Sequence, residues 1–154
     1  MNPDLSVFYE NSKRLQYNPS SFFIRKRTGI KRLIAFEDRF EEVKKVLEEL
    51  IAQKHRVSLK VLDIGVGDGI YEAILGNDFR ERCEFFGIDI SKEQAARAKK
   101  YLKEIKIIDI NSKDLPYKNN YFDIVIASEI LEHVFYPEKV LNEAQRVLKR
   151  NGFM

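Results

Sequence analysis

The feature that most constrains the fold is an apolar run that stops at an acid and continues into three closely spaced glycines. It spans residues 61–69 and reads Val-Leu-Asp-Ile-Gly-Val-Gly-Asp-Gly. Glycine lacks a Cβ, so a strand that ends in this loop can bring bare backbone against a ligand. A phosphate-binding loop would favour a nearby cation, whereas this loop is preceded by Asp63. The segment therefore predicts a ligand with an amino group and a positive centre.

The spacing of the glycines differs from the usual dinucleotide fingerprint. The chain reads G-x-G-x-G from Gly65 to Gly69, whereas dinucleotide-binding turns read G-x-G-x-x-G. A glycine-rich turn is a weak signal by itself, because a tight strand-to-helix turn without any ligand has the same pattern. The rest of the chain must decide between these alternatives.

Length and composition indicate one globular domain. The chain has 154 residues, of which 33% are charged and 44% hydrophobic. Its apolar runs are shorter than the roughly 18 residues of a membrane span, and no signal peptide is visible, so we expect a cytoplasmic protein without a membrane partner. A single cysteine, Cys83, excludes an internal disulfide. With His55 and His133 as the only histidines, we expect no metal site of the Cys/His type.

Charge is distributed unevenly along the chain. Residues 1–60 carry 13 basic and 8 acidic side chains, whereas residues 61–154 carry 14 and 16. The basic cluster of the first part consists of Arg25, Lys26, Arg27, Lys31 and Arg32. Short basic runs are common on solvated surfaces, and the alternative is an anionic partner, either a phosphorylated substrate or nucleic acid. Because no nucleic-acid-binding motif accompanies the cluster, we expect no nucleic-acid partner.

Strand and helix patterns alternate after an N-terminal helix. Apolar residues at helical spacing predict that helix over residues 36–53. The capping box at Ser91 and Gln94 and the proline at 137 mark two later helix starts. The expected strands are 59–64, 85–90, 105–108 and 122–127, and the expected helices are a short one ending at Gly76, one over 95–102, and one from Pro137 to Gly152.

This order predicts an α/β fold with parallel strands joined by right-handed crossovers. Strands buried on both faces should be almost entirely apolar, and these are. We therefore predict a doubly wound, Rossmann-like parallel sheet with strand order 3-2-1-4. We divide the chain into an N-terminal helical or lid segment, residues 1–57, and a ligand-binding domain, residues 58–154.

Polar side chains follow all four expected strands. They are Asp63, Asp89, Asp109 and the pair Ser128 and Glu129. In an open α/β sheet the ligand binds outside the carboxyl ends of the strands. Asp89 is placed to accept two hydrogen bonds from the hydroxyls of a ribose. Any one of these acids also suits a helix N-cap or a turn, but packing would not require polar groups at four strand ends.

Taken in order, the motifs resemble those of class I S-adenosylmethionine-dependent methyltransferases, in particular the type 11 group. The resemblance covers roughly residues 58–154, and Arg150 and Asn151 stand where Pro-Gly is common. It implies transfer of a methyl group from S-adenosylmethionine to a small-molecule acceptor. The motifs that carry it are Val61–Gly69, Phe86–Ser91, Leu115–Tyr117, Tyr121–Val125, Ile130–Val134 and Arg146–Gly152.

The resemblance also implies which residues contact the cofactor. At the first strand, Asp63, Gly65 and Gly67 would line the methionine moiety, together with Val66 between the glycines. Ser128, after the fourth strand, belongs to the same set.

The ribose and adenine fall to the second and third strands in this resemblance. Asp89 would hold the ribose hydroxyls and Ile90 would pack on the adenine. Asp109 would accept from the adenine amino group, with a backbone contact from Ile110. Counting back from the Leu-Pro motif in some relatives places Asn111 at that position instead of Asp109.

Methyl transfer from a sulfonium is an in-line displacement, so the protein mainly aligns the acceptor with the methyl carbon. A general base is needed only where the acceptor must lose a proton. His133 and Glu132 are the nearest candidates, and the alternative for His133 is a structural role at the start of a helix. Tyr9, Tyr17 and Phe22 would line the acceptor side of a lid.

Full members of the resembled family continue through three further strands, and this sequence ends where the fifth should begin. We therefore expect a truncated form of the fold with one open sheet edge. Such an edge favours a homodimer or a partner chain that covers it. An alternative function follows, a non-catalytic S-adenosylmethionine-binding module or one that depends on a partner. A nicotinamide-dependent oxidoreductase is disfavoured by the glycine spacing and by Asp63.

Overall fold

Strands and helices alternate along residues 39–53 and 58–154, the part of the chain that the computed structural model describes. The predicted strands are confirmed, with boundaries within two residues of those expected. The elements are α3 Arg39–Gln53, β1 Leu59–Ile64, α4 Ile70–Arg82, β2 Cys83–Asp89, α5 Lys92–Ala98, the 3-10 helix η1 Lys99–Tyr101, β3 Glu104–Ile107, β4 Phe122–Ile126, the 3-10 helix η2 Leu131–His133, α6 Pro137–Val147 and β5 Leu148–Phe153.

In the described residues the strands form one parallel sheet in the order β3-β2-β1-β4-β5. The predicted fold class and the order of its first four strands are confirmed. In chain order, β2 and β3 lie on one side of β1, and the chain then crosses to β4 on the other side. The carboxyl ends of β1 and β4 therefore flank the point where the strand order reverses, which is where open α/β sheets bind ligands.

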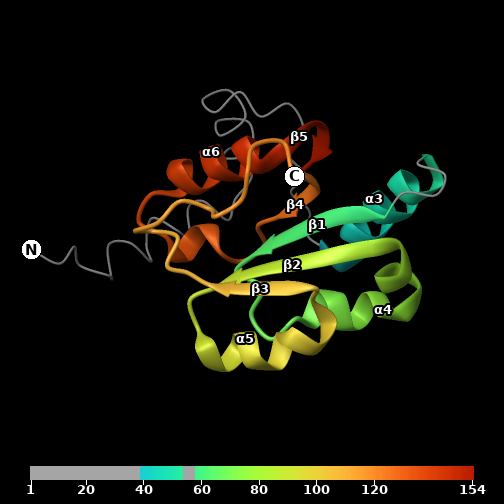
Figure 1. The fold of residues 1–154 in the computed structure, drawn as a ribbon, viewed down its shortest axis with the longest axis horizontal. Helices are drawn as coiled ribbons and strands as arrows, with labels where there is room; N and C mark the ends of the chain where they lie inside the picture. The colour runs from blue at the N-terminus through green and yellow to red at the C-terminus, as the bar shows by residue number, and fades with distance from the viewer. Residues whose placement is uncertain (1–38, 54–57) are drawn as a thin grey trace, which may run out of the picture.

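Helices cover both faces of the sheet, with α6 on one side and α4 and α5 on the other (Figure 1). Side chains of β1 alternate between the two cores that result. Leu59 and Val61 are buried in the core that includes α3, whereas Leu62 and Ile64 are buried in the core that includes α6. By the same alternation, Asp63 shares its face with Leu59 and Val61.

The last helix ends earlier than predicted. α6 stops at Val147 rather than Gly152, and Leu148, with φ −74° and ψ 136°, already has extended backbone. From there β5 runs parallel to β4, with Leu148 opposite Phe122. The expectation that the sequence ends before a fifth strand is therefore wrong.

Within the described residues β4 is an inner strand, because it pairs with β5 as well as with β1. The Lys149 ammonium lies 2.8 Å from the carboxylate of the buried Asp123, which joins the two strands through side chains as well as backbone. Met154 follows β5 and is 8% exposed, within the same core as α6. In the described residues the outer strands of the sheet are β3 and β5.

Two other helices differ in extent from the prediction. Gly76, with φ 78°, interrupts α4 as expected, but a second helical stretch carries the element on to Arg82. α5 ends at Ala98, before the expected Leu102, and η1 follows it. The Ser91 hydroxyl accepts a hydrogen bond of 3.3 Å from the Gln94 N–H, so the predicted N-cap is present.

Several predictions concern the N-terminal segment and lie outside the described residues. These are the basic cluster, the lid residues Tyr9, Tyr17 and Phe22, and the boundary between residues 57 and 58. The division into two domains stays a prediction. Within the described part, α3 packs on the sheet through the buried Leu47 and Leu50.

Candidate functional site

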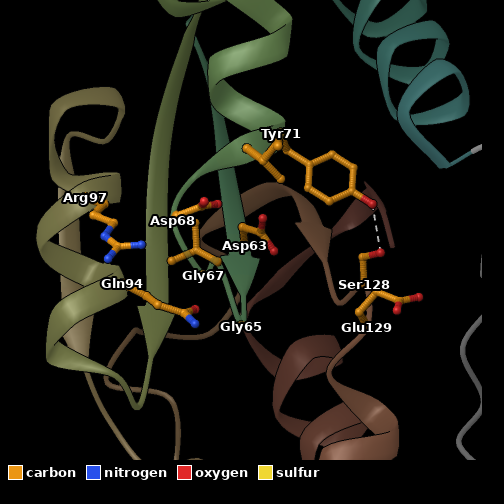
Figure 2. A pocket seen from close by; sticks show the side chains of 11 residues that line it. Asp63, Gly65, Gly67, Asp68, Tyr71, Gln94, Arg97, Ser128 and Glu129 are labelled. Atoms are coloured by element: carbon orange, nitrogen blue, oxygen red, sulfur yellow. Dashed lines mark hydrogen bonds between the residues drawn. The ribbon is translucent and has the colours of Figure 1, made fainter.

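A cavity of about 350 Å³ opens at the carboxyl ends of β1 and β4. In Figure 2, Asp63 lies at its centre, between Gln94 and Arg97 on one side and Tyr71 and Ser128 on the other. The volume falls within the range of small-molecule sites. The lining residues are Asp63, Gly65, Val66, Gly67, Asp68, Ile70, Tyr71, Gln94, Arg97, Ser128 and Glu129. Among them are all the residues predicted at the first and fourth strands.

The glycine loop presents backbone to this cavity. Gly65 and Gly67 have φ angles of 81° and 58°, a region that side chains with a Cβ rarely adopt. A Cβ on Gly65 would also lie 3.0 Å from the side chain of Ile130. The N–H groups of Gly65 and Val66 both donate to the Ile88 carbonyl, at 2.8 and 3.1 Å. These bonds hold the loop against the end of β2.

Asp89, at the end of β2, accepts hydrogen bonds from the glycine loop and from the N-cap residue of α5. One carboxylate oxygen accepts from the Gly67 N–H at 2.8 Å, and the other accepts from the Ser91 N–H at 2.7 Å. The side chain is 8% exposed and does not line the cavity. Each oxygen keeps a further lone pair, so the predicted bonds to ribose hydroxyls are compatible with this arrangement. That role stays a prediction.

Two buried carboxylates flank the glycine loop in the sequence. Asp63 lines the cavity and is 2% exposed, and Glu72, in the first turn of α4, is fully buried. Among the described residues, neither carboxylate oxygen of Glu72 has a hydrogen-bond partner. Burial raises the pKa of Glu72 to about 7. Burial, then the charge of Glu72, then that of Asp89 raise the pKa of Asp63 well above its ordinary value. This arrangement favours a cationic group in the cavity.

Sequence reasoning missed Glu72. A signal for it exists, because Glu72 precedes Leu75 and Phe79 by three and seven residues. Those two side chains pack against the core beneath α4. A charge on the face of a helix that packs on a sheet is an exception to the usual amphipathic pattern.

The third side of the cavity comes from the segment after β4. The Ser128 hydroxyl shares a hydrogen bond of 2.8 Å with the Tyr71 hydroxyl, which connects this segment to α4 (Figure 2). Glu129 follows with a φ of 55°, a conformation that costs energy outside glycine and is concentrated at functional sites. The sequence predicted Ser128 as a site residue and Tyr71 only as part of a helix.

α5 contributes two lining residues that were not predicted as site residues. Gln94 and Arg97 are three residues apart, so they lie on one face of the helix and reach the same wall of the cavity. The Arg97 guanidinium also pairs with Glu93 at 2.6 Å, and both side chains are largely exposed. The capping box pointed to Gln94 only as a helix-capping residue.

The residues predicted to meet the adenine do not line this cavity. Ile90 is 67% exposed, whereas Ile110 is buried. The Asp109 carboxylate accepts from the Asn111 N–H at 2.9 Å, and this bond is the main reason that the pKa of Asp109 is lowered. The Asn111 side-chain oxygen accepts from the Phe135 N–H at 2.8 Å. Both candidate side chains thus have local partners, and the adenine contacts of all these residues stay predictions.

Glu132 and His133 lie on η2, which also stands apart from the cavity lining. The His133 backbone N–H donates to the Ile130 carbonyl at 2.9 Å, and the His133 side chain is exposed. Their proposed part in proton transfer stays a prediction.

In residues 39–53 and 58–154, no three His, Cys, Asp or Glu side chains come together in a way that could hold a metal ion. The same stretches contain no helix with the length and apolarity that a membrane crossing requires.

Comparison with known proteins identifies one family. The methyltransferase domain matches residues 62–154. An uncharacterised protein of Methanocaldococcus jannaschii is 39% identical over 125 residues, which cover 80% of this chain and 50% of that protein. A phosphatidylethanolamine N-methyltransferase of Cereibacter sphaeroides is 29% identical over 99 residues, which cover 60% of this chain and 47% of the enzyme.

Among solved structures, a SAM-dependent methyltransferase from Aquifex aeolicus superimposes with a TM-score of 0.53 at 26% identity. The match covers 86% of this chain and 68% of that one. The chain spans about half the length of the curated relatives it matches, 44% and 50% for the first two.

Proposed function

The chain belongs to the methyltransferase domain family, as its motifs predict, and from that premise we propose that it transfers a methyl group from S-adenosylmethionine to a small-molecule acceptor. One observation carries the proposal: the buried Asp63 faces a cavity whose adjoining wall is glycine backbone. A buried carboxylate that faces a cavity suits a ligand that brings its own positive charge.

The residues present fit the cofactor. When bound, S-adenosylmethionine supplies a methyl group that is already activated on a sulfonium. Asp63 would hold the amino group of its methionine moiety, and the surface at Gly65 and Gly67 would let that moiety approach the backbone. Asp89 would accept from the ribose hydroxyls while it holds the glycine loop in place. The protein then aligns an acceptor with the methyl carbon, a contribution of up to ~7–11 kcal/mol.

A non-catalytic or partner-dependent S-adenosylmethionine-binding module remains the second candidate. The observation behind it is that Glu132 and His133, the candidate general bases, do not line the cavity. A homodimer or a partner chain would now pair with the outer edge of β5 rather than with β4. Sedimentation at high concentration tests this, and a clean monomer would contradict it.

Isothermal titration of the 154-residue chain with S-adenosylmethionine tests the proposed cofactor, and NAD is the negative control. Asp63→Asn should weaken binding, whereas the matched change Asp78→Asn, of an exposed acid in α4, should leave it unaltered. Binding of NAD without S-adenosylmethionine would favour an oxidoreductase instead. A methyl-transfer assay on candidate acceptors then separates the two candidates, since binding without turnover supports the module.

A further inference from the structure

We propose that Glu72 is a specificity-determining residue of the cofactor site. From its buried place in the first turn of α4 it favours the positively charged methyl donor over the uncharged thioether product, and it releases a proton to solvent when the donor binds. The proposal rests on the proposed function, because it assumes that the cavity takes S-adenosylmethionine before reaction and S-adenosylhomocysteine after it.

The first argument is the position of Glu72. Its side chain is fully buried, and both carboxylate oxygens lack a hydrogen-bond partner. Buried polar groups are almost always paired, so an acid left in this state needs a reason other than stability. Its charge acts on Asp63 more strongly than that of Asp89 does. Asp63 in turn lines the cavity.

The second argument is that, among the residues that the structure describes, no cation neutralises the Glu72 carboxylate. The guanidinium of Arg80 donates to the backbone carbonyl of Glu72 at 3.0 Å and makes no hydrogen bond to the Glu72 carboxylate. The sheet presents Asp63 from β1 and Asp89 from β2, both acids. Of the other elements that pack on α4, α3 carries exposed charges and η1 carries two exposed lysines and a tyrosine. These groups are Lys44, Lys45, Glu48, Glu49, Lys99, Lys100 and Tyr101.

The third argument is the charge difference between donor and product. Both carry the same amino and carboxylate groups, but only the donor carries a sulfonium. A negative charge on Glu72 therefore stabilises the bound donor more than the bound product. The effect reaches across several ångströms in a poorly solvated interior. Burial raises the pKa of Glu72 to about 7, so at pH 6.5 more than half of the ligand-free protein carries this carboxyl protonated. A cation in the cavity favours the ionised carboxylate, so the proton leaves to solvent.

Isothermal titration at pH 6.5 measures both consequences. The chain is titrated with S-adenosylmethionine and with S-adenosylhomocysteine in two buffers of different ionisation enthalpy, which counts the protons released. We expect release of a sizeable fraction of one proton with the donor and less with the product. Glu72→Gln should abolish the difference and lower the preference for donor over product by about fivefold. The matched control, Glu81→Gln, changes an exposed acid of the same helix and should alter neither value.

Each outcome decides the matter. Equal proton release for the two ligands in the wild-type protein would overturn the inference, and this measurement needs no variant that must fold. An unchanged donor preference in Glu72→Gln would overturn it as well. If the wild-type chain binds neither ligand, the proposed function itself fails, which is a different result from binding without discrimination.

Discussion

Two glutamates of this domain have pKa values that are shifted in opposite directions. Glu143, in α6, accepts from the Arg146 guanidinium with both oxygens at 2.7 Å and from the Leu115 N–H at 2.8 Å. The Arg146 bonds are the main reason that its pKa is lowered. Glu72, in α4, has no partner, and burial raises its pKa. The direction of each pKa follows from whether the fold provides a partner.

Glu143 belongs to a network that stabilises the fold, whereas we assign Glu72 to the candidate binding site. Beyond Glu143, the Arg146 guanidinium donates to the carbonyls of Leu115 and Tyr117 and to the side chain of Asn119, so it fastens the loop before β4 to α6. An ionised Glu143 therefore contributes to folding. An ionised Glu72 costs folding free energy, and only a ligand that brings positive charge can offset that cost.

The largest expected effect comes from removing the charge of Glu72. Its pKa is raised in the folded state from 4.5 to about 7. The protein therefore loses stability as pH rises between these values, since the unfolded chain releases the proton first. Glu72→Gln should raise the free energy of unfolding by about 3 kcal/mol at pH 8 and by little at pH 4. Urea denaturation at the two pH values measures this, and an equal change at both would refute the assignment.

Removing Arg146 should act in the other direction. Arg146→Ala breaks the pair with Glu143 and the bonds to the loop, and should lower the free energy of unfolding by about 2 kcal/mol because the side chains are partly solvated. Arg97→Ala is the matched control, as its pair with Glu93 is largely exposed and should contribute below about 0.5 kcal/mol. Thermal unfolding compares the two variants, and similar melting temperatures would show that the network adds nothing.

Asp89 lies between these extremes, because it is bonded and also placed for a ligand. Asp89→Ala should weaken binding of S-adenosylmethionine by ~1–3 kcal/mol, the scale of lost hydrogen bonds to a charged group. Titration calorimetry gives the value, with Asp109→Ala as a comparison that also tests the adenine assignment. Unchanged affinity would remove Asp89 from the site.

The smallest effect is the shape of the pH profile. Glu143, with its lowered pKa, stabilises the fold above the ordinary glutamate range and loses this contribution as pH falls through its folded pKa. Glu72 lowers stability on the other side, as pH rises towards 7. Wild-type stability should therefore peak in mildly acidic solution. A maximum above pH 8 in denaturation measurements would contradict the assignment of Glu72.

The strands and the glycine loop could be predicted because their sequence signals are local. Each buried strand is an apolar run with only one or two polar residues, and the loop from Gly65 to Gly69 needs backbone conformations that glycine adopts readily. β5 could not be predicted in this way. Lys149, Arg150 and Asn151 resemble a polar helix end, and they become a strand only because β4 offers an edge and Asp123 offers a partner.

The residues of the candidate site also fall into two sets, those that the sequence predicts and those that the packing of helices places there. Asp63 and Ser128 were predicted from their places at strand ends and Val66 from the family resemblance, and all three line the cavity. Tyr71 and Arg97 reach it from helices whose orientation depends on how α4 and α5 pack. The same packing removes Glu72 from water.

By itself, the sequence determined the parallel sheet, the glycine loop and the family, because apolar runs and glycine spacing act over a few neighbouring residues. Only the tertiary structure decided which polar groups are desolvated and which are paired. Solvation and pairing depend on the elements that close over a side chain, and those elements come from distant parts of the chain.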